Sequence, residues 1–256
     1  HPSLTCGRSV VPPVLGPSAA PSGNSTFIPR RHRPRRVSDR DSRGQSDRDP
    51  ADGAERVVAG AALFNERHLL AAQSVWEATP TASSETREED AERLLRGLGA
   101  TAAATRRAVD GDGQEASGHA EDAAVALAAV TDPQGVAVTP VREWAERLAA
   151  APEGAESATP PRVRVDDETP TFGDLSLGAA GLAAPALAAA GEPGDEATLA
   201  TAAEFASEAR GTGRTEFAEL LFAYLRTPDA RPQVAARLGD HVEREERKRR
   251  DVDGLF

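Results

Sequence analysis

Alanine is the commonest apolar residue of this chain, and this limits the kind of core that the chain can build. Aromatic residues make up only 4% of the sequence, so few side chains can fill a large interior space. Each alanine buries far less area than a leucine or phenylalanine. We therefore expect an all-α fold, in which Ala, Leu and Val pack between closely spaced helices. The 256 residues suffice for one large domain or two small ones.

The charge of the chain is strongly acidic. Thirty Lys and Arg stand against 41 Asp and Glu, which gives a net charge of −11, and Lys248 is the only lysine. Acid excess, scarce lysine and abundant alanine together resemble a halophile protein, whose carboxylates keep the surface hydrated where salt screens charge repulsion. We expect the protein to need high salt to fold.

The first part of the chain differs in composition from the rest. Residues 1–50 carry nine arginines and four aspartates, which makes them +5 against −16 for the remainder. They lack apolar periodicity, so we expect residues 1–52 to form a disordered tail. The arginines of 30–36 could form a nucleic-acid arm, a solvated tail or upstream sequence translated from a misplaced start. The absence of Met favours the last reading, and we expect no nucleic-acid partner.

Several other classes of protein are not expected. The sequence has neither the apolar stretch of a signal peptide nor a membrane span of about 20 apolar residues, which predicts a cytoplasmic protein with no membrane partner. The single cysteine, Cys6, lies in the tail. No two of the five histidines have a helical i, i+3 or i, i+4 spacing. We therefore expect neither a metal site nor another cofactor.

The most informative stretch predicts two short helices that fold back on each other. Large apolar residues recur at helical spacing on both sides of a break at 65–68. The residues of the two stripes are Val57, Ala61 and Phe64, then Leu69, Ala72 and Trp76. The stretch predicts a helix-turn-helix that opens a helical bundle over residues 53–132.

The remaining helices are separated by Gly and Pro. Thr86 and Glu89 form a candidate capping box for the next helix, and a fourth helix is predicted at 116–130. A C-terminal helical region is predicted over 137–256, with an extended linker at 160–170 in which Arg and Val alternate. Pro185 should kink or shorten its helix. The C-terminal helices are predicted at 140–151, 173–190, 195–210, 215–227 and 231–250.

Four short motifs resemble the small all-helical family called domain of unknown function 309. The motifs are Phe64-Asn65, Ala72, Trp76-Glu77 and Leu95-x-Gly97-Leu98. The C-terminal end, residues 251–256, is similar to that of extended haloarchaeal members. The resemblance covers about residues 55–130, and the C-terminal half loosely. It implies a compact helical bundle that begins with a helix-turn-helix, and no established activity.

The chain also departs from the family pattern at several polar positions. The family has Gly, Tyr, His-Glu and Ile-Gln where this chain has Arg67, Leu69, Gln73-Ser74 and Gly99-Ala100. These departures remove most of the polar groups that a pocket would need. If the family has a catalytic or metal site there, we expect this member to lack it.

Five residues of the hairpin remain as a candidate pocket or groove: Asn65, His68, Gln73, Trp76 and Glu77. Trp76 is expected to anchor the core, or else to stack on a ligand. Asn65 is expected to be a turn residue, because asparagine tolerates left-handed geometry. Glu77 is expected to bond a neighbouring helix or turn, and is the one weak candidate for a general base if it is buried beside Gln73.

Two classes of function follow from these residues. The first is a non-catalytic interaction or scaffold module that presents a groove between its first two helices to an unknown protein partner or to a second copy. The second is a small-ligand binder or hydrolase-type enzyme that uses Glu77 and its neighbours. We favour the first. A closed pocket lined by Glu77 and Gln73 with unpaired polar atoms would favour the second.

Overall fold

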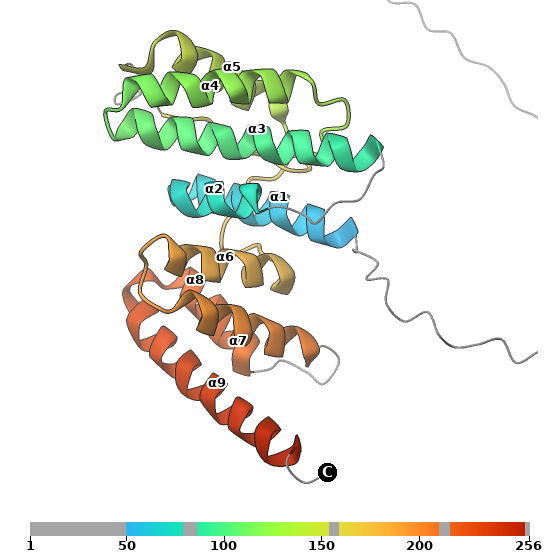
Figure 1. Cartoon of the computed structure of the whole chain (residues 1–256), viewed down its shortest axis with the longest axis vertical. Helices are drawn as coiled ribbons and strands as arrows, with labels where there is room; N and C mark the ends of the chain where they lie inside the picture. Colours follow the sequence, from blue (N-terminus) through green and yellow to red (C-terminus); the bar gives the residue numbers. More distant parts are fainter. Residues whose placement is uncertain (1–49, 79–85, 154–158, 210–215, 254–256) are drawn as a thin grey trace, which may run out of the picture. The chain divides into compact units, whose positions relative to one another are not determined.

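The computed structural model describes residues 50–78, 86–153, 159–209 and 216–253, all of which belong to one compact unit (Figure 1). These residues form an all-α fold, which confirms the predicted fold class. Their α-helices are α1 (Pro50–Asn65), α2 (Leu69–Glu77), α3 (Thr86–Val109), α4 (Gly113–Ala128), α5 (Val138–Ala150), α6 (Leu177–Ala189), α7 (Glu196–Glu208), α8 (Glu216–Arg226) and α9 (Arg231–Asp253).

The first helix begins before the predicted boundary. α1 begins at Pro50, whereas the tail was expected to extend to residue 52. The rest of the predicted tail, residues 1–49, lies outside the described residues. The side chain of Thr86, on which the predicted capping box depends, lies outside them too.

Short polar side chains fix the start of three helices. Asp112 accepts a hydrogen bond from the backbone of Glu115 at the start of α4. Ser176 does the same for Ala179 in α6, and Asp195 for Thr198 in α7. Such caps satisfy backbone N–H groups that have no partner within the helix. They set where α4, α6 and α7 begin.

The hairpin of α1 and α2 occupies the middle of the helix packing. It contacts α3 on one side and α6 on the other, while α3, α4 and α5 pack together and α6 to α9 pack together (Figure 1). Because α2 has neighbours on both sides, residues off its predicted stripe are buried as well. Val75 is one of them, with only 6% of its surface exposed.

One apolar core cluster crosses the boundary that was predicted between two helical regions. It includes Leu127 from α4 and Val141 from α5, and it continues to Val242 in α9. Smaller clusters lie between α3, α4 and α5, where Trp144 donates a hydrogen bond to Thr105. The division at 132–137 falls in the α4–α5 loop and stays a prediction.

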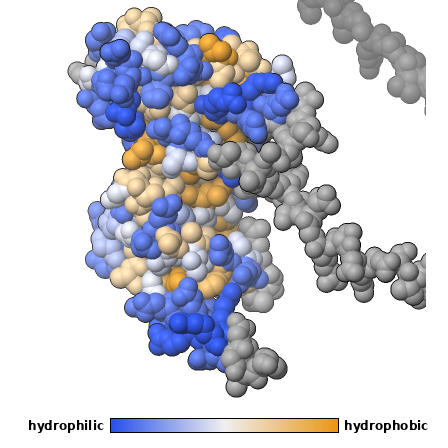
Figure 2. Space-filling model, in the orientation of Figure 1, coloured by the Kyte–Doolittle hydropathy of each residue, from blue (hydrophilic) through white to orange (hydrophobic). Residues whose placement is uncertain are grey.

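The polarity of the exposed surface also changes along the stack of helices. Figure 2 shows polar side chains over the α3–α5 layer and over α9, and apolar side chains between them, over α1, α2 and α6. Leu70 on α2 belongs to the few large apolar side chains that are exposed among the described residues. The central hairpin therefore lies under the least polar part of this face.

The segment 159–176 has no α-helix and crosses the end of α1 as an extended strap, as expected for 160–170. Val163 and Val165 are buried, whereas Arg162 and Arg164 are exposed. The alternation of Arg and Val in the sequence is therefore an alternation of exposed and buried side chains, and the strap buries its valine side. α6 then begins at Leu177 and ends at Ala189. Pro185 lies inside this helix and does not end it, and a kink at Pro185 stays a prediction.

Candidate functional site

Asn65, the last residue of α1, holds the strap in place. Its side chain is buried, and its Nδ2 donates hydrogen bonds to the carbonyl oxygens of Val163 at 3.0 Å and Pro170 at 3.1 Å. Its Oδ1 accepts a hydrogen bond from the Val163 N–H at 2.8 Å. The two donors of an amide are thereby used, so Asn65 fixes the strap and has no N–H left for a ligand.

The turn after α1 places an arginine in a left-handed conformation. The Arg67 N–H donates to the Phe64 carbonyl and the His68 N–H donates to the Leu63 carbonyl, the two bonds of a Schellman helix end. Arg67 has φ 72°, a conformation that glycine adopts more easily than other residues. The left-handed residue of this turn is Arg67 and not Asn65, which corrects the expected role of the asparagine.

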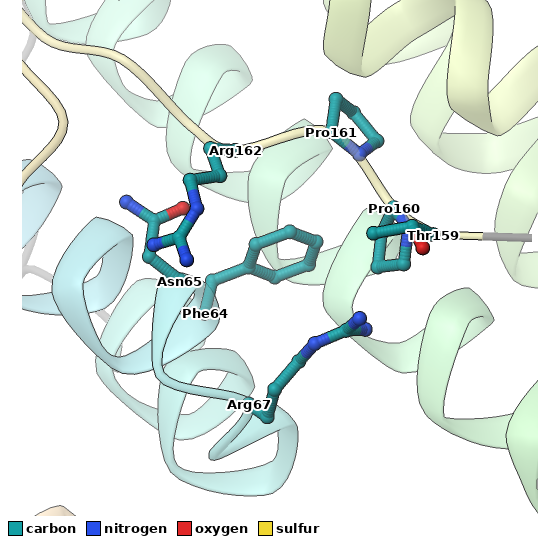
Figure 3. A pocket seen from close by; sticks show the side chains of 7 residues that line it. All are labelled: Phe64, Asn65, Arg67, Thr159, Pro160, Pro161 and Arg162. Atoms are coloured by element: carbon teal, nitrogen blue, oxygen red, sulfur yellow. The ribbon is translucent and has the colours of Figure 1, made fainter.

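A small hollow lies between this turn and the strap (Figure 3). It holds about 60 Å³, enough for a few waters or one small oxyanion and far below the roughly 300 Å³ of a drug-sized pocket. In Figure 3 the ring of Phe64 lies between the side chains of Arg67 and Arg162. The lining residues are Phe64, Asn65, Arg67, Thr159, Pro160, Pro161 and Arg162. We call this the Arg67–Arg162 hollow.

The charge of the Arg67–Arg162 hollow is the opposite of that of the whole chain. Arg67 and Arg162 both line it, and none of the described residues that line it is acidic, although the chain carries −11. Within the described part of the chain, neither Arg67 nor Arg162 forms an ion pair or a side-chain hydrogen bond. Arg67 comes from the turn after α1 and Arg162 from the strap, so the strap that Asn65 fixes brings them to one hollow.

Gln73 and Glu77 form a pair on α2, beside α3. The Gln73 Nε2 donates to both carboxylate oxygens of Glu77, at 3.0 and 3.2 Å. Glu77 is exposed, and its stem packs over Gly99, where an added Cβ would lie 3.0 Å from the Glu77 Cγ. The Gln73 Oε1 is buried without a hydrogen-bond partner among the described residues, but Glu77 is exposed, so these two residues do not form the closed pocket that would have favoured an enzyme.

Trp76 is a core residue that depends on a glycine. Only 2% of its surface is exposed, and its ring centroid lies 6.0 Å from that of Phe64. A Cβ at Gly60 would lie 2.2 Å from the Trp76 Nε1, so the absence of a side chain at Gly60 makes room for the indole. The indole N–H is buried and has no hydrogen-bond partner among the described residues.

His68 faces a second polar cluster, away from the Arg67–Arg162 hollow. Its Nδ1 lies 3.7 Å from the Glu192 Oε1, and Glu192 also pairs with Arg231 at 2.7 Å. Burial lowers the pKa of His68, and the charge of Arg231 lowers it further, whereas Glu192 and Glu66 raise it in part. The predicted pocket residues thus face three directions, and only Asn65 among them lines the hollow.

Arg231 is the centre of this second cluster and is buried. Its Nη1 pairs with Glu192, and its Nε donates to the Tyr224 carbonyl at 3.2 Å. Burial raises the pKa of Tyr224 to about 12, and the Arg231 charge opposes that rise. The Tyr224 hydroxyl and the Arg231 Nη2 are buried without a hydrogen-bond partner among the described residues. Sequence reasoning missed this cluster, because a single arginine at a helix start gives no signal of burial.

The residues of the Arg67–Arg162 hollow were also missed as a group. Arg67 was noted only as the position where the family has Gly, and Arg162 only as part of the strap. Arg67 offered a usable signal, because a residue that replaces Gly at a helix end is a candidate for left-handed geometry. Arg162 offered none, since Arg67, which lines the same hollow, lies 95 residues away along the chain.

Comparisons with protein-family models, curated proteins and solved structures give no match to this chain. No helix of the described residues combines the length and apolar character needed to cross a bilayer. In the same residues, His, Cys, Asp and Glu side chains nowhere gather in threes as metal ligands would. A function is therefore inferred from the geometry of the side chains.

Proposed function

We propose that the protein is a non-catalytic interaction module that binds its partner at the surface formed by the turn after α1 and residues 159–162 of the strap. The observation that carries this proposal is the pair Arg67 and Arg162, which line one hollow and have no ion-pair partner among the described residues. Asn65 fixes the strap beside them, so the surface is formed before a partner binds, which lowers the entropy cost of binding.

The motif residues support a packing role for the rest of the hairpin. Leu95 and Leu98 are buried, and a Cβ at Gly97 would lie 2.6 Å from the Leu127 side chain, so Gly97 lets α4 approach α3 closely. Trp76 fills the core. Glu77 is exposed and paired with Gln73, which gives no support to an enzyme that uses Glu77 as a general base.

We further propose that the chain is a degenerate member of the domain-of-unknown-function family 309. The left-handed Arg67 supports this relation, because the family has Gly at that position and glycine favours that conformation. The acidic composition is consistent with the halophile members. A cytoplasmic location, and a protein partner or second copy as the binding target, belong to the same proposal.

Site-specific photo-crosslinking tests the proposed surface. A photoreactive residue is placed at Thr159, an exposed lining residue of the hollow, or at Glu66, the exposed neighbour of Arg67 in the turn, and as a control at Glu121 on α4. We expect adducts of one defined mass from the first two positions and none from Glu121. We also expect the adducts to disappear when Arg67→Gly and Arg162→Ala are combined.

The same experiment separates the two kinds of partner. An adduct that forms in the purified protein alone, at twice the mass of the chain, identifies a second copy. An adduct that needs cell extract identifies a different protein. Adducts from Glu121 as abundant as those from Thr159, or adducts that persist without both arginines, would contradict the proposed surface.

A further inference from the structure

We propose that His68 is a pH-sensitive switch: protonation of His68 opens the turn after α1 and moves Arg67 away from the Arg67–Arg162 hollow. This inference rests on the proposed function, whose surface includes the hollow, and adds a regulation of that surface by pH. His68 directly follows Arg67 in the chain. The His68 N–H donates to the Leu63 carbonyl at 2.9 Å, which is one of the two hydrogen bonds that hold the turn. A movement of His68 therefore moves Arg67 as well.

The Glu192 carboxylate lies between His68 and a buried arginine. The Glu192 Oε1 lies 3.7 Å from the His68 Nδ1, and the Glu192 Oε2 pairs with the Arg231 Nη1 at 2.7 Å. Among the described residues, Glu66 in the same turn is the other charged group that acts on His68. The ring of Phe172 in the strap packs against the imidazole at a centroid distance of 5.8 Å. The turn, the strap, the α6–α7 loop and the start of α9 thus meet at His68.

This site favours neutral His68 over charged His68. Burial disfavours the charged imidazole, and the positive charge of Arg231 repels it. Both effects lower the pKa of His68, and the carboxylates of Glu192 and Glu66 oppose them only in part. Protonation at acidic pH therefore places a charge where the fold disfavours one, so that one of the contacts around His68 has to break.

Exposure to solvent decides which contact breaks. Arg231 is only 2% exposed, so its separation from Glu192 would leave a buried charge without its partner, which is strongly destabilising. The side chain of His68 is 24% exposed, and it reaches water when the turn opens. Arg67 in the same turn has φ 72°, a conformation that disfavours a side chain, so opening of the turn also relieves this strain. The turn is therefore the part that moves.

Amide hydrogen exchange of Arg67 and His68 between about pH 7.5 and about pH 5.5 tests this inference. The full chain is used, at a KCl concentration that preserves its helical circular dichroism signal, and protection factors remove the pH dependence of the intrinsic exchange rate. We expect the protection of both amides to fall by up to about tenfold toward the lower pH, because an unfolded histidine takes up its proton near pH 6.5. In His68→Gln the Arg67 amide should show no such fall, whereas His119→Gln on α4 should behave as wild type does.

The Leu98 amide in α3 separates opening of the turn from unfolding of the whole chain. At each pH the Arg67 and His68 amides should be at least about tenfold less protected than the Leu98 amide, because the turn opens while α3 stays folded. The inference is overturned if the Arg67 amide shows no fall in wild type, if it falls equally in His68→Gln, or if all three amides are equally protected. Crosslinking from Thr159 at neutral pH tests the proposed surface independently, so its failure would leave the switch in the turn standing.

Discussion

Asn65 and Val163 exchange two hydrogen bonds across 98 residues of chain: the Asn65 Nδ2 donates to the Val163 carbonyl, and the Val163 N–H donates to the Asn65 Oδ1. Two antiparallel β-strands exchange the same kind of hydrogen-bond pair, but here the Asn65 side chain takes the place of one strand's backbone. The pairing lets an exposed strap bury its valines at the end of α1. It also sets Arg162 beside the hollow that Arg67 lines.

Asn65→Ala should destabilise the protein by about 3 kcal/mol. The change leaves the buried Val163 N–H and two carbonyls without their partner, and each unsatisfied buried group costs about 1–3 kcal/mol less whatever relaxation recovers. Urea unfolding followed by circular dichroism measures the difference. Gln114→Ala, which removes an exposed amide from α4, is the control and should change stability by less than about 0.5 kcal/mol.

Gly60→Ala and Gly53→Ala should have opposite effects, although both glycines lie in α1. An alanine Cβ at Gly60 would lie 2.2 Å from the Trp76 indole, and the buried ring cannot move aside, so we expect a loss of about 1–3 kcal/mol. Nothing lies within 4 Å of a Cβ at Gly53, so alanine there should add about 0.5–1 kcal/mol. Equal thermal midpoints for the two variants would show that the indole does not pack on Gly60.

Arg67→Gly should stabilise the folded protein by about 1 kcal/mol. Arg67 has φ 72°, and a side chain in that conformation costs about 1–2 kcal/mol that glycine avoids, offset in part by the greater freedom of glycine in the unfolded chain. Arg96→Gly is the matched control, because Arg96 lies inside α3 and glycine there should cost about 1 kcal/mol. A loss of stability in both variants would show that Arg67 is not strained.

Stability should fall as the pH drops below the ordinary pKa of histidine, and His68 should cause part of the fall. Burial and the nearby Arg231 lower the pKa of His68 in the folded state, against the partial opposition of Glu192 and Glu66. The unfolded chain takes up a proton near pH 6.5, while the folded protein does so only at lower pH. The stability that neutral His68 contributes is therefore fully present above pH 6.5. It is lost as the pH falls through the pKa of His68 in the folded protein.

Urea midpoints measured from about pH 7.5 to about pH 5 test this dependence. His68→Gln should show a shallower decline than wild type, because the residue that cannot charge no longer opposes folding. His119→Gln on α4 is the control and should decline as wild type does. Parallel curves for wild type and His68→Gln would contradict the role given to His68.

The helices of this protein could be predicted well because their signals are local. The stripe that ends at Phe64 is buried, as are Ala72 and Trp76 of the second stripe, whereas Leu69 is only half-buried; the predicted break holds the turn between α1 and α2. Val75 was expected off the stripe but is buried, because α3 and α6 cover α2 from two sides. Which faces of a helix are covered depends on neighbours that the local pattern does not specify.

The polar contacts could not be predicted, because they join distant parts of the chain. Asn65 was expected to matter for its own backbone, yet its role is to bind Val163 and Pro170. Arg231 begins α9 like many surface arginines, and only the fold brings Glu192 to it. A sequence read alone shows which residues can bond, and the packing of helices decides which of them meet.

Amide hydrogen exchange at Val163 tests the central claim most directly, which is that Asn65 fixes the strap and thereby forms the Arg67–Arg162 surface. In wild-type protein the Val163 N–H donates to the Asn65 Oδ1 at 2.8 Å and should exchange slowly. In Asn65→Ala this amide should exchange at a rate close to that of an unprotected amide, while the amide of Leu98 in α3 stays protected in the same sample. Equal protection of Val163 in both proteins, or fast exchange already in wild type, would contradict the claim.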